Sequence, residues 1–353
     1  MSTLFTNFFQ KINHISPQES DFTEVLSTIA LKPKTLYFYG KLPQNMVKTA
    51  KKQNNPNVKL HNKTPQESSQ KSRTHTIKTR PKTVAIVGSR HNTKYGEEVA
   101  YKLAYELSKK GVIVVSGLAF GIDSIAHKGC LDAGGTTIAV LGTPIDQIYP
   151  VNHKSLAEQI LHQNGAIMSE YPPHNTTDTP LAPGEYYDEA TGKRLLNLKA
   201  SFLYRNRLIA GLSDIVVVVE AAEKSGSLNT ATHALEQGKD VYAVPGNITN
   251  PYSQGCNKLI RQGAIPYTEP TDILRELFPE DHIKHHRAFR QANLFGDTDV
   301  ETKILQAIFA GARTGEEIMQ SAILPPEVFG EAVSLLEIKG RLRSLGMNTW
   351  SLA

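Results

Sequence analysis

The fold is decided by residues 83–90, which read Thr83-Val84-Ala85-Ile86-Val87-Gly88-Ser89-Arg90. The first five positions are apolar or β-branched without alternation, which is typical of a strand buried on both faces of a parallel sheet. The glycine and the polar residues behind it indicate a turn at the carboxyl end of that strand. Open α/β sheets bind their ligands at this edge, so the turn is a candidate site.

Similar β-branched runs recur along the chain, and stretches of helical length separate them. The predicted strands are Val84–Val87, Val112–Val115, Thr137–Leu141, Ile215–Val219 and Val241–Val244, with others at Leu36–Tyr39 and near Ile167. The predicted helices are Tyr95–Lys109, Ile122–Ala133, Leu156–Gln163 and Leu228–Gln237, and Gly111, Gly165 and Gly238 stand where a helix-terminating glycine belongs. This alternation predicts an α/β fold with a doubly wound, mostly parallel sheet.

Charge and composition divide the 353 residues further. Residues 43–82 carry ten Lys and Arg against Glu67 alone, a net charge of +9, whereas the rest of the chain sums to −4. This segment is polar and has no clean period, which predicts a disordered basic linker; an inert tether is the alternative. The predicted organisation is a short N-terminal segment (1–42), this linker (43–82), the α/β domain (83–278), a second linker (279–298) and a C-terminal module (299–353). The connection between Ile167 and Arg205 is unusually long, and Tyr186-Tyr187 and Leu195-Leu196 predict a hairpin within it.

The C-terminal module has its own helical signals. Ile304, Leu305, Ile308 and Phe309 have helical spacing, and Thr314 with Glu317 forms a capping box before a second helix. A third helix is predicted from about Glu327 to Lys339, followed by a hairpin. Three helices and a hairpin predict a winged helix-turn-helix.

Several classes of protein are excluded by composition. Cys130 and Cys256 are far apart and no Cys-x-x-Cys occurs, which argues against a disulfide framework or a cysteine-rich zinc module. No apolar run approaches the roughly 18 residues of a membrane span, and we find no signal peptide, so we expect a cytoplasmic protein with no membrane partner. The cluster of His282, His285 and His286 has no carboxylate or cysteine nearby, so we predict a solvated linker and no metal.

Loops that suit phosphate follow three of the predicted strands. They are Gly88-Ser89-Arg90, the turn from Ser116 and Gly117 to Gly121 and Asp123, and Ser225-Gly226-Ser227 with Thr230. Glycines let the backbone approach a ligand, and helix starts offer free N–H groups. No P-loop or dinucleotide fingerprint is present, so no cofactor is predicted. A glycine turn can also be mere backbone geometry.

Arg205-Asn206-Arg207 precedes Leu208-Ile209-Ala210-Gly211, which we interpret as two guanidinium groups at the start of a helix. Phe202 and Tyr204 lie beside them. Basic groups interleaved with aromatic rings are what single-stranded nucleic acid requires. The alternatives are core packing for Phe202 and an ion pair with Asp214 or Glu220 for either arginine. Asp123 and His127 share a helix face; we expect Asp123 to orient the glycine-rich turn and His127 to satisfy a buried polar contact, with catalysis as the minor alternative.

These motifs together resemble the DprA/Smf family of DNA-processing proteins. The resemblance rests on Val84–Arg90, Ser116–Asp123 with His127, Ile138–Gly142, Arg205–Ser213, Glu220-Ala221, Ser225–Thr230, Ala243–Gly246, Gly255–Ile260 and Gly263-Ala264. It covers residues 83–277 almost without a break, together with Leu31–Leu42 and the C-terminal module.

The resemblance implies an extended Rossmann domain that binds single-stranded DNA, forms a homodimer and loads the RecA recombinase during natural transformation, without enzymatic turnover. It implies that Arg90 and the stretch from Phe202 to Arg207 contact the DNA, with Lys199 as a further phosphate contact. Three departures stand out. The family's N-terminal helical domain is expected to be absent or reduced, residues 43–82 and 174–200 look like insertions, and Leu203 replaces a proline of the family pattern.

Two alternative functions are a nucleoside monophosphate hydrolase and a transcription regulator. Related Rossmann enzymes hydrolyse nucleoside monophosphates with a glutamate in a Pro-Gly-Gly-x-Gly-Thr-x-x-Glu loop, but here His233 stands three residues after Thr230. A winged-helix transcription regulator is weaker, because Glu327, Glu331 and Glu337 on the third helix would repel phosphate.

Overall fold

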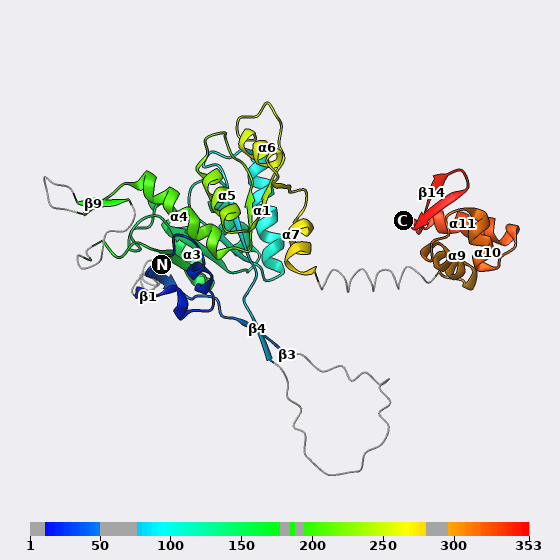
Figure 1. The fold of residues 1–353 in the computed structure, drawn as a ribbon, viewed down its shortest axis with the longest axis horizontal. Coiled ribbons are helices and arrows are strands. Elements are labelled where there is room, and N and C mark those ends of the chain that lie inside the picture. Colours follow the sequence, from blue (N-terminus) through cyan, green and yellow to red (C-terminus); the bar gives the residue numbers. More distant parts are fainter. Residues whose placement is uncertain are drawn as a thin grey trace, which may run out of the picture. The chain divides into compact units, whose positions relative to one another are not determined.

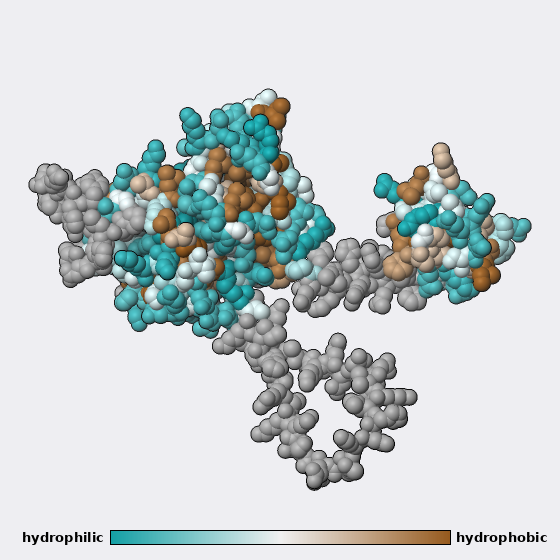
Figure 2. Space-filling view, in the orientation of Figure 1, coloured by the Kyte–Doolittle hydropathy of each residue, from teal (hydrophilic) through white to brown (hydrophobic). Residues whose placement is uncertain are grey.

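The computed structural model describes residues 11–49, 76–174, 176, 184–187, 194–279 and 296–352. The chain divides into two units, Met1–Leu277 and Phe278–Ala353, and each is described by itself. In the view of Figure 2, both present a largely hydrophilic surface with smaller apolar patches. Within the described parts of the chain, none of the helices is both long and apolar enough to span a bilayer.

A nine-stranded sheet forms the centre of unit 1 (Figure 1). Its spatial order is β1 (Asn13–Ile15), β2 (Leu36–Gly40), β8 (Ala166–Ser169), β7 (Thr137–Leu141), β6 (Ile113–Ser116), β5 (Thr83–Val87), β11 (Ile215–Val218), β12 (Asp240–Ala243) and β13 (Ile265–Pro266). The strands from β8 to β13 run parallel, and β1 and β2 are antiparallel additions at one edge. The prediction of a mostly parallel α/β sheet is confirmed, and the five strands of its centre differ from their predicted bounds by one residue at most.

Helices cover both faces of the sheet, so every position of its central strands is buried. One face packs against α4 (Leu198–Leu212), α5 (Gly226–Glu236) and the 3-10 helix η3 (Glu24–Ser27). The other packs against α2 (Ile122–Asp132) and α3 (Lys154–His162), and α1 (Lys94–Lys109) packs on α2. Unit 1 also contains η2 (Pro17–Glu19), η4 (Val151–His153), α6 (Gln254–Arg261) and α7 (Pro270–Leu277).

Two of the three predicted helix-ending glycines adopt positive φ, namely Gly111 at 75° and Gly238 at 67°. After α3 the left-handed residue is instead Asn164, with φ of 59°. Gly165 comes next and is needed for a different reason, because a Cβ there would lie 2.4 Å from the Thr137 carbonyl oxygen. The predicted hairpin in the long connection is confirmed: β9 (Glu185–Tyr187) pairs antiparallel with β10 (Arg194–Leu196).

The prediction of a disordered linker over 43–82 is wrong at both ends of that segment. Strand β3 (Met46–Thr49) pairs antiparallel with β4 (Thr76–Thr79), and residues 50–75 lie outside the described residues. The Arg80 guanidinium lies 3.1 Å from the Asp214 carboxylate and also donates to the Leu212 carbonyl. The mean composition of the segment concealed these strands, although Val47, Thr49, Thr76, Ile77 and Thr79 are residues of high β-propensity.

Unit 2 contains α9 (Asp299–Phe309), α10 (Gly315–Ala322), α11 (Pro326–Ile338) and the antiparallel pair β14 (Leu342–Gly346) and β15 (Thr349–Leu352). The predicted capping box is confirmed, because Thr314 and Glu317 bond reciprocally at the start of α10. Ile304, Leu305, Ile308, Phe329 and Leu336 belong to its separate core. The histidine cluster at 282–286 lies outside the described residues.

Candidate functional site

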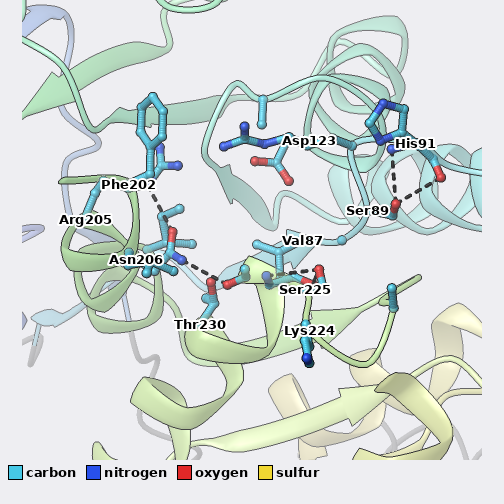
Figure 3. Close-up of a pocket in the computed structure, with 18 of the residues that line it drawn as sticks. Val87, Ser89, His91, Asp123, Phe202, Arg205, Asn206, Lys224, Ser225 and Thr230 are labelled. Carbon is cyan, nitrogen blue, oxygen red and sulfur yellow. Dashed lines mark hydrogen bonds between the residues drawn. The ribbon is translucent and has the colours of Figure 1, made fainter. Parts of the chain in front are cut away.

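A cleft of about 580 Å³ opens at the carboxyl ends of β5, β6 and β11. The chain winds from β5 through β6 towards one edge of the sheet and from β11 towards the other. The cleft therefore lies at the point where the winding direction reverses, which is the usual ligand site of open α/β sheets. Figure 3 shows its lining side chains around Val87, with Phe202, Arg205 and Asn206 on one side and Lys224, Ser225 and Thr230 on another.

The structure brings most of the predicted site residues together in this cleft. Its lining includes Gly88, Ser89, Arg90, Lys199, Phe202, Arg205, Asn206, Ser225, Gly226, Ser227 and Thr230. Ser116, Gly117, Gly121 and Arg207 do not line it; Gly117 lines a smaller adjoining hollow. The sequence reasoning missed His91, Lys224 and Tyr252. His91 and Lys224 are direct neighbours of predicted residues, whereas Tyr252 carries no local signal and reaches the cleft through the fold.

The interpretation of Arg205-Asn206-Arg207 as the start of a helix is wrong. Helix α4 begins seven residues earlier, at Leu198, after Asn197, whose side chain accepts a hydrogen bond from the Ala200 N–H. The three residues are therefore interior helical positions, and all three are buried. Successive side chains leave a helix about 100° apart, so each contacts a different part of the domain.

Arg205 contacts the loop after β6 and the carboxyl-terminal part of β7. Its guanidinium donates to the carbonyl oxygens of Gly117 and Val140. Burial lowers the pKa of Arg205 to about 10, with the carboxylate of Asp123 opposing the shift. Arg205 thus lines the cleft, but most of its donors are engaged by the protein itself.

Arg207 points away from the cleft, so the prediction that it contacts DNA is not supported by its position. It forms two hydrogen bonds to the Glu170 carboxylate, of 2.7 and 2.8 Å, and donates to the Leu31 carbonyl. Burial raises the pKa of Glu170, and Arg207 opposes that shift. An ion pair was the alternative interpretation, but its partner is Glu170. Asp214 instead pairs with Arg80, and Glu220 accepts from Thr93.

Asn206 links α4 to the loop before α5. Its amide nitrogen donates to the Gly226 carbonyl at 3.2 Å. Ser225 is the N-cap of α5, with its side chain accepting from the Ser227 N–H. The first turn of α5 therefore lines the cleft, and a helix start is a general binding site for anions.

Three cationic side chains with exposed surface border the cleft: Arg90, Lys199 and Lys224. Arg90 is placed with its guanidinium carbon 5.3 Å from the centre of the Phe202 ring. Phe202 is half-buried and does not belong to the described core clusters, and a Cβ on Gly142 would lie 2.6 Å from its ring. A cation over an aromatic face presents charge and a flat apolar surface at one position.

The turns around the cleft are fixed by close backbone approach. Gly121 has φ of 75°, and a Cβ on it would lie 2.3 Å from the Ser89 carbonyl oxygen. Ser116 is buried and donates to the Ile86 carbonyl. Asp123 accepts a hydrogen bond from the Gly117 N–H at 3.0 Å, as expected of a residue that orients the turn. Burial raises the pKa of Asp123, although Arg205 and the backbone donors oppose this.

His127 is fully buried beneath the turn, where its Nδ1 lies 2.7 Å from the Thr137 hydroxyl. Burial lowers its pKa to about 3, and the nearby His153 and Arg205 act in the same direction. The ring is therefore neutral near pH 7, and its contact with Thr137 is the buried polar contact predicted from the sequence. Within the described ranges, no three His, Cys, Asp or Glu side chains gather as metal ligands would.

The family model of DNA recombination-mediator protein A matches residues 73–183 and 190–278, which is more than half of the chain. The chain belongs to this family. The resemblance to DprA/Smf proteins found in the sequence is thereby confirmed.

Individual relatives agree with this family. The chain is 46% identical to protein Smf of Escherichia coli over 194 residues, covering 55% of this chain and 46% of that protein. It is 38% identical to DNA processing protein DprA of Bacillus subtilis over 214 residues, covering 61% and 65% respectively. The matches thus span about half to two thirds of the length of these relatives.

Two solved structures share the fold. The X-ray structure of DprA from Streptococcus pneumoniae matches with a TM-score of 0.53 at 32% identity, covering 77% of this chain and 76% of that one. DprA from Helicobacter pylori, whose structure describes a single-stranded DNA binding mode, matches with a TM-score of 0.52 at 27% identity, covering 76% and 97%.

Proposed function

We propose that unit 1 binds single-stranded DNA in the cleft at the carboxyl ends of β5, β6 and β11. The observation that carries this proposal is the pairing of Arg90 with Phe202, 5.3 Å apart, at the rim of a cleft bordered by Lys199 and Lys224. Cations attract the phosphates, and a ring face stacks on any base. The H. pylori relative supports the same ligand class.

These groups recognise features common to all nucleotides. Cationic side chains and helix-start amides contact phosphates, which carry no sequence information. Stacking on a ring is likewise tolerant of base identity. We therefore propose binding with little sequence preference.

We further propose that the protein acts as a recombination mediator without catalysing a reaction. Among the described residues lining the cleft, Asp123 is the one carboxylate, and it already accepts from the Gly117 N–H. The position of the hydrolases' catalytic glutamate is taken by His233, which lies 3.0 Å from Glu236. Membership of the family supports loading of RecA during natural transformation and a homodimeric state as parts of this proposal.

Unit 2 is proposed to be a winged-helix module with a secondary role, in contact with duplex DNA or protein. Its three helices and hairpin support the architecture. Glu327 and Glu331 are exposed on α11, the helix that would enter the major groove, which opposes direct reading of bases.

The test is a titration of the full chain with single- and double-stranded oligonucleotides over a salt series, alongside a nucleoside monophosphate hydrolysis assay. Each phosphate contact should contribute about −0.7 to the slope of log affinity against log salt. Arg90→Ala should weaken binding and flatten the slope. Lys110→Ala is the matched control, because Lys110 is exposed just beyond the far end of α1. Equal affinity for both variants, or hydrolysis by the wild type, would contradict the proposal.

A further inference from the structure

Two aromatic side chains that were not among the predicted site residues are exposed beside the cleft. Phe120 is 44% exposed and Tyr149 is 41% exposed. Isolated apolar residues on a surface are ordinary, but these two come from separate loops and border the same hollow. Their shared position requires an explanation.

That hollow continues the cleft beyond Phe202. Its lining consists of Phe120, Tyr149, Pro150, Gly117, Ala119, Arg90, Phe202 and Arg205. Four of these residues also line the main cleft: Arg90, Ala119, Phe202 and Arg205. Phe202 and Arg90 therefore stand between the two spaces, with phosphate-binding groups on one side and aromatic rings on the other.

Neighbouring side chains hold these rings. The ring centre of Tyr149 lies 5.3 Å from that of Phe202, with an angle of 31° between the planes. The Phe120 ring meets His153 edge-on with centres 4.7 Å apart. His153 is itself anchored, because its Nδ1 lies 2.8 Å from the Leu118 carbonyl oxygen. The rings are thus presented in defined positions.

The backbone that carries Phe120 is strained. Leu118 is a buried, non-glycine residue with φ of 60°, and Gly121 has φ of 75°. Ala119 and Phe120 lie between these two left-handed positions. Strain of this kind persists where the surrounding structure enforces it, and it concentrates at ligand sites. Here its result is a phenylalanine directed out of the core.

We propose that Phe120, Tyr149 and Phe202 form an aromatic platform on which bases of one DNA strand stack, while the strand's phosphates face Arg90 and Lys199. This inference rests on the proposed function and extends it. It adds Phe120 and Tyr149 to the binding residues and orients the bound strand, with its bases towards the aromatic rings. Stacking on rings needs no hydrogen bonds to base edges, so the platform accepts any base.

The experiment compares two oligonucleotides of equal charge, a 20-mer of thymidine and a 20-mer of abasic sites. The variants are Phe120→Ala and Tyr149→Ala in the full chain, with Phe120→Tyr and Tyr149→Phe as conservative partners. Tyr101→Ala is the matched control, because Tyr101 is 38% exposed on α1 and pairs with Tyr105 rather than with the cleft. Affinity, salt slope and melting temperature are measured for each.

Each alanine variant should lose about five-fold or more in affinity for the thymidine strand, the lower end of base–aromatic stacking. Affinity for the abasic strand and the salt slope should stay unchanged, and the aromatic replacements should bind like the wild type. Wild-type affinity of Phe120→Ala for thymidine would overturn the platform. Loss on both strands alike would also overturn it, since it would indicate a general distortion. If the wild type bound neither strand, the proposed function itself would fail.

Discussion

Arg90 and Arg207 illustrate, at the scale of single residues, how two arginines in similar motifs differ in role. Arg90 is exposed and forms no ion pair with a described residue. The Arg207 side chain is instead 2% exposed and forms two hydrogen bonds to the Glu170 carboxylate. Removing one partner of a buried ion pair leaves the other as an uncompensated buried charge. Substitutions of these two arginines should therefore separate binding from folding.

Arg207→Met should lower the free energy of unfolding by about 3–5 kcal/mol, because Glu170 would remain buried without its partner. DNA affinity per folded molecule should hardly change, in contrast to Arg90→Ala. Urea denaturation together with DNA titration measures both quantities. The double variant Arg207→Met with Glu170→Leu should recover much of the loss. A large loss of DNA affinity in a fully folded Arg207→Met protein would show that Arg207 contributes to DNA binding.

His127 should make stability depend on pH. Its pKa is lowered to about 3 in the folded protein, chiefly by burial, whereas an unfolded histidine titrates near 6.5. Below pH 6.5 the unfolded chain therefore binds a proton that the folded chain excludes, so stability falls as the pH falls towards 3. The loss between pH 7 and pH 4 should be roughly 3 kcal/mol at 1.36 kcal/mol per unit.

His127→Gln should remove this contribution, so that its stability curve falls less steeply with acid than that of the wild type. Urea denaturation at pH 7, 5.5 and 4 measures the difference. His162→Gln, at an exposed position, is the control. Parallel curves for wild type and His127→Gln would show that the buried histidine is not responsible.

At the scale of elements, the glycine-rich turn between β6 and α2 shapes the cleft. Gly121 and Gly134 both have positive φ, of 75° and 72°, but a Cβ on Gly134 would meet nothing within 4 Å. On Gly121 it would lie 2.3 Å from the Ser89 carbonyl oxygen. Alanine at Gly134 would add only the free-energy cost of the left-handed backbone conformation. Alanine at Gly121 would add to it the cost of the steric clash with Ser89.

Gly134→Ala should lower stability by about 1–2 kcal/mol, the cost of a left-handed conformation in a residue with a Cβ. Gly121→Ala should cost clearly more and should also weaken DNA binding, because the turn must move away from Ser89. Thermal unfolding and DNA titration of both variants test this. Equal effects of the two substitutions on stability and affinity would contradict the collision argument.

The elements differ in how far the sequence predicts them. Strands β5, β6, β7, β11 and β12 could be predicted because unbroken β-branched runs are typical of a sheet covered on both sides. The predicted start of α4 at Arg205 is wrong: Asn197 is the N-cap, and it lies at the end of a long connection whose local sequence has no clear helical period. Both the β-branched runs of the strands and the N-cap Asn197 of α4 are local signals. The runs have one plausible interpretation, whereas the sequence around Asn197 is compatible with a loop as well as with a helix start.

The direction of each side chain in α4 could not be predicted in the same way. Arg205, Asn206 and Arg207 contact residues that are 88, 20 and 37 positions away, respectively. Such partners are set by the packing of α4 on the sheet, and no local spacing encodes them. Phe120 and Tyr149 were missed for the same reason, since only the fold brings their loops together.

At the scale of the whole molecule, each unit has its own core. A chain that ends at residue 279 should therefore fold and retain most of the single-strand affinity, because the described residues that line the cleft all belong to unit 1. The comparison is made with the full chain at equal salt, by titration and melting temperature. A folded truncated chain that no longer binds would show that unit 2 contributes to the site.

Residues 50–75 carry six Lys and Arg against Glu67, a net charge of +5. Thr49 and Thr76 are directly paired in the hairpin of β3 and β4, so Asn-Gly can replace the segment and close a two-residue turn. We predict that this replacement weakens DNA binding several-fold at low salt and hardly at high salt, because the Debye length shrinks from about 30 Å at 0.01 M to about 3 Å at 1 M. The melting temperature should not change, since Arg80 and Asp214 are retained. Replacing the six basic residues by Gln in the full-length segment is the matched control and should have the same effect on binding. A clear fall in melting temperature after the replacement, or a loss of affinity that persists at 1 M salt, would show that the segment contributes contacts other than charge.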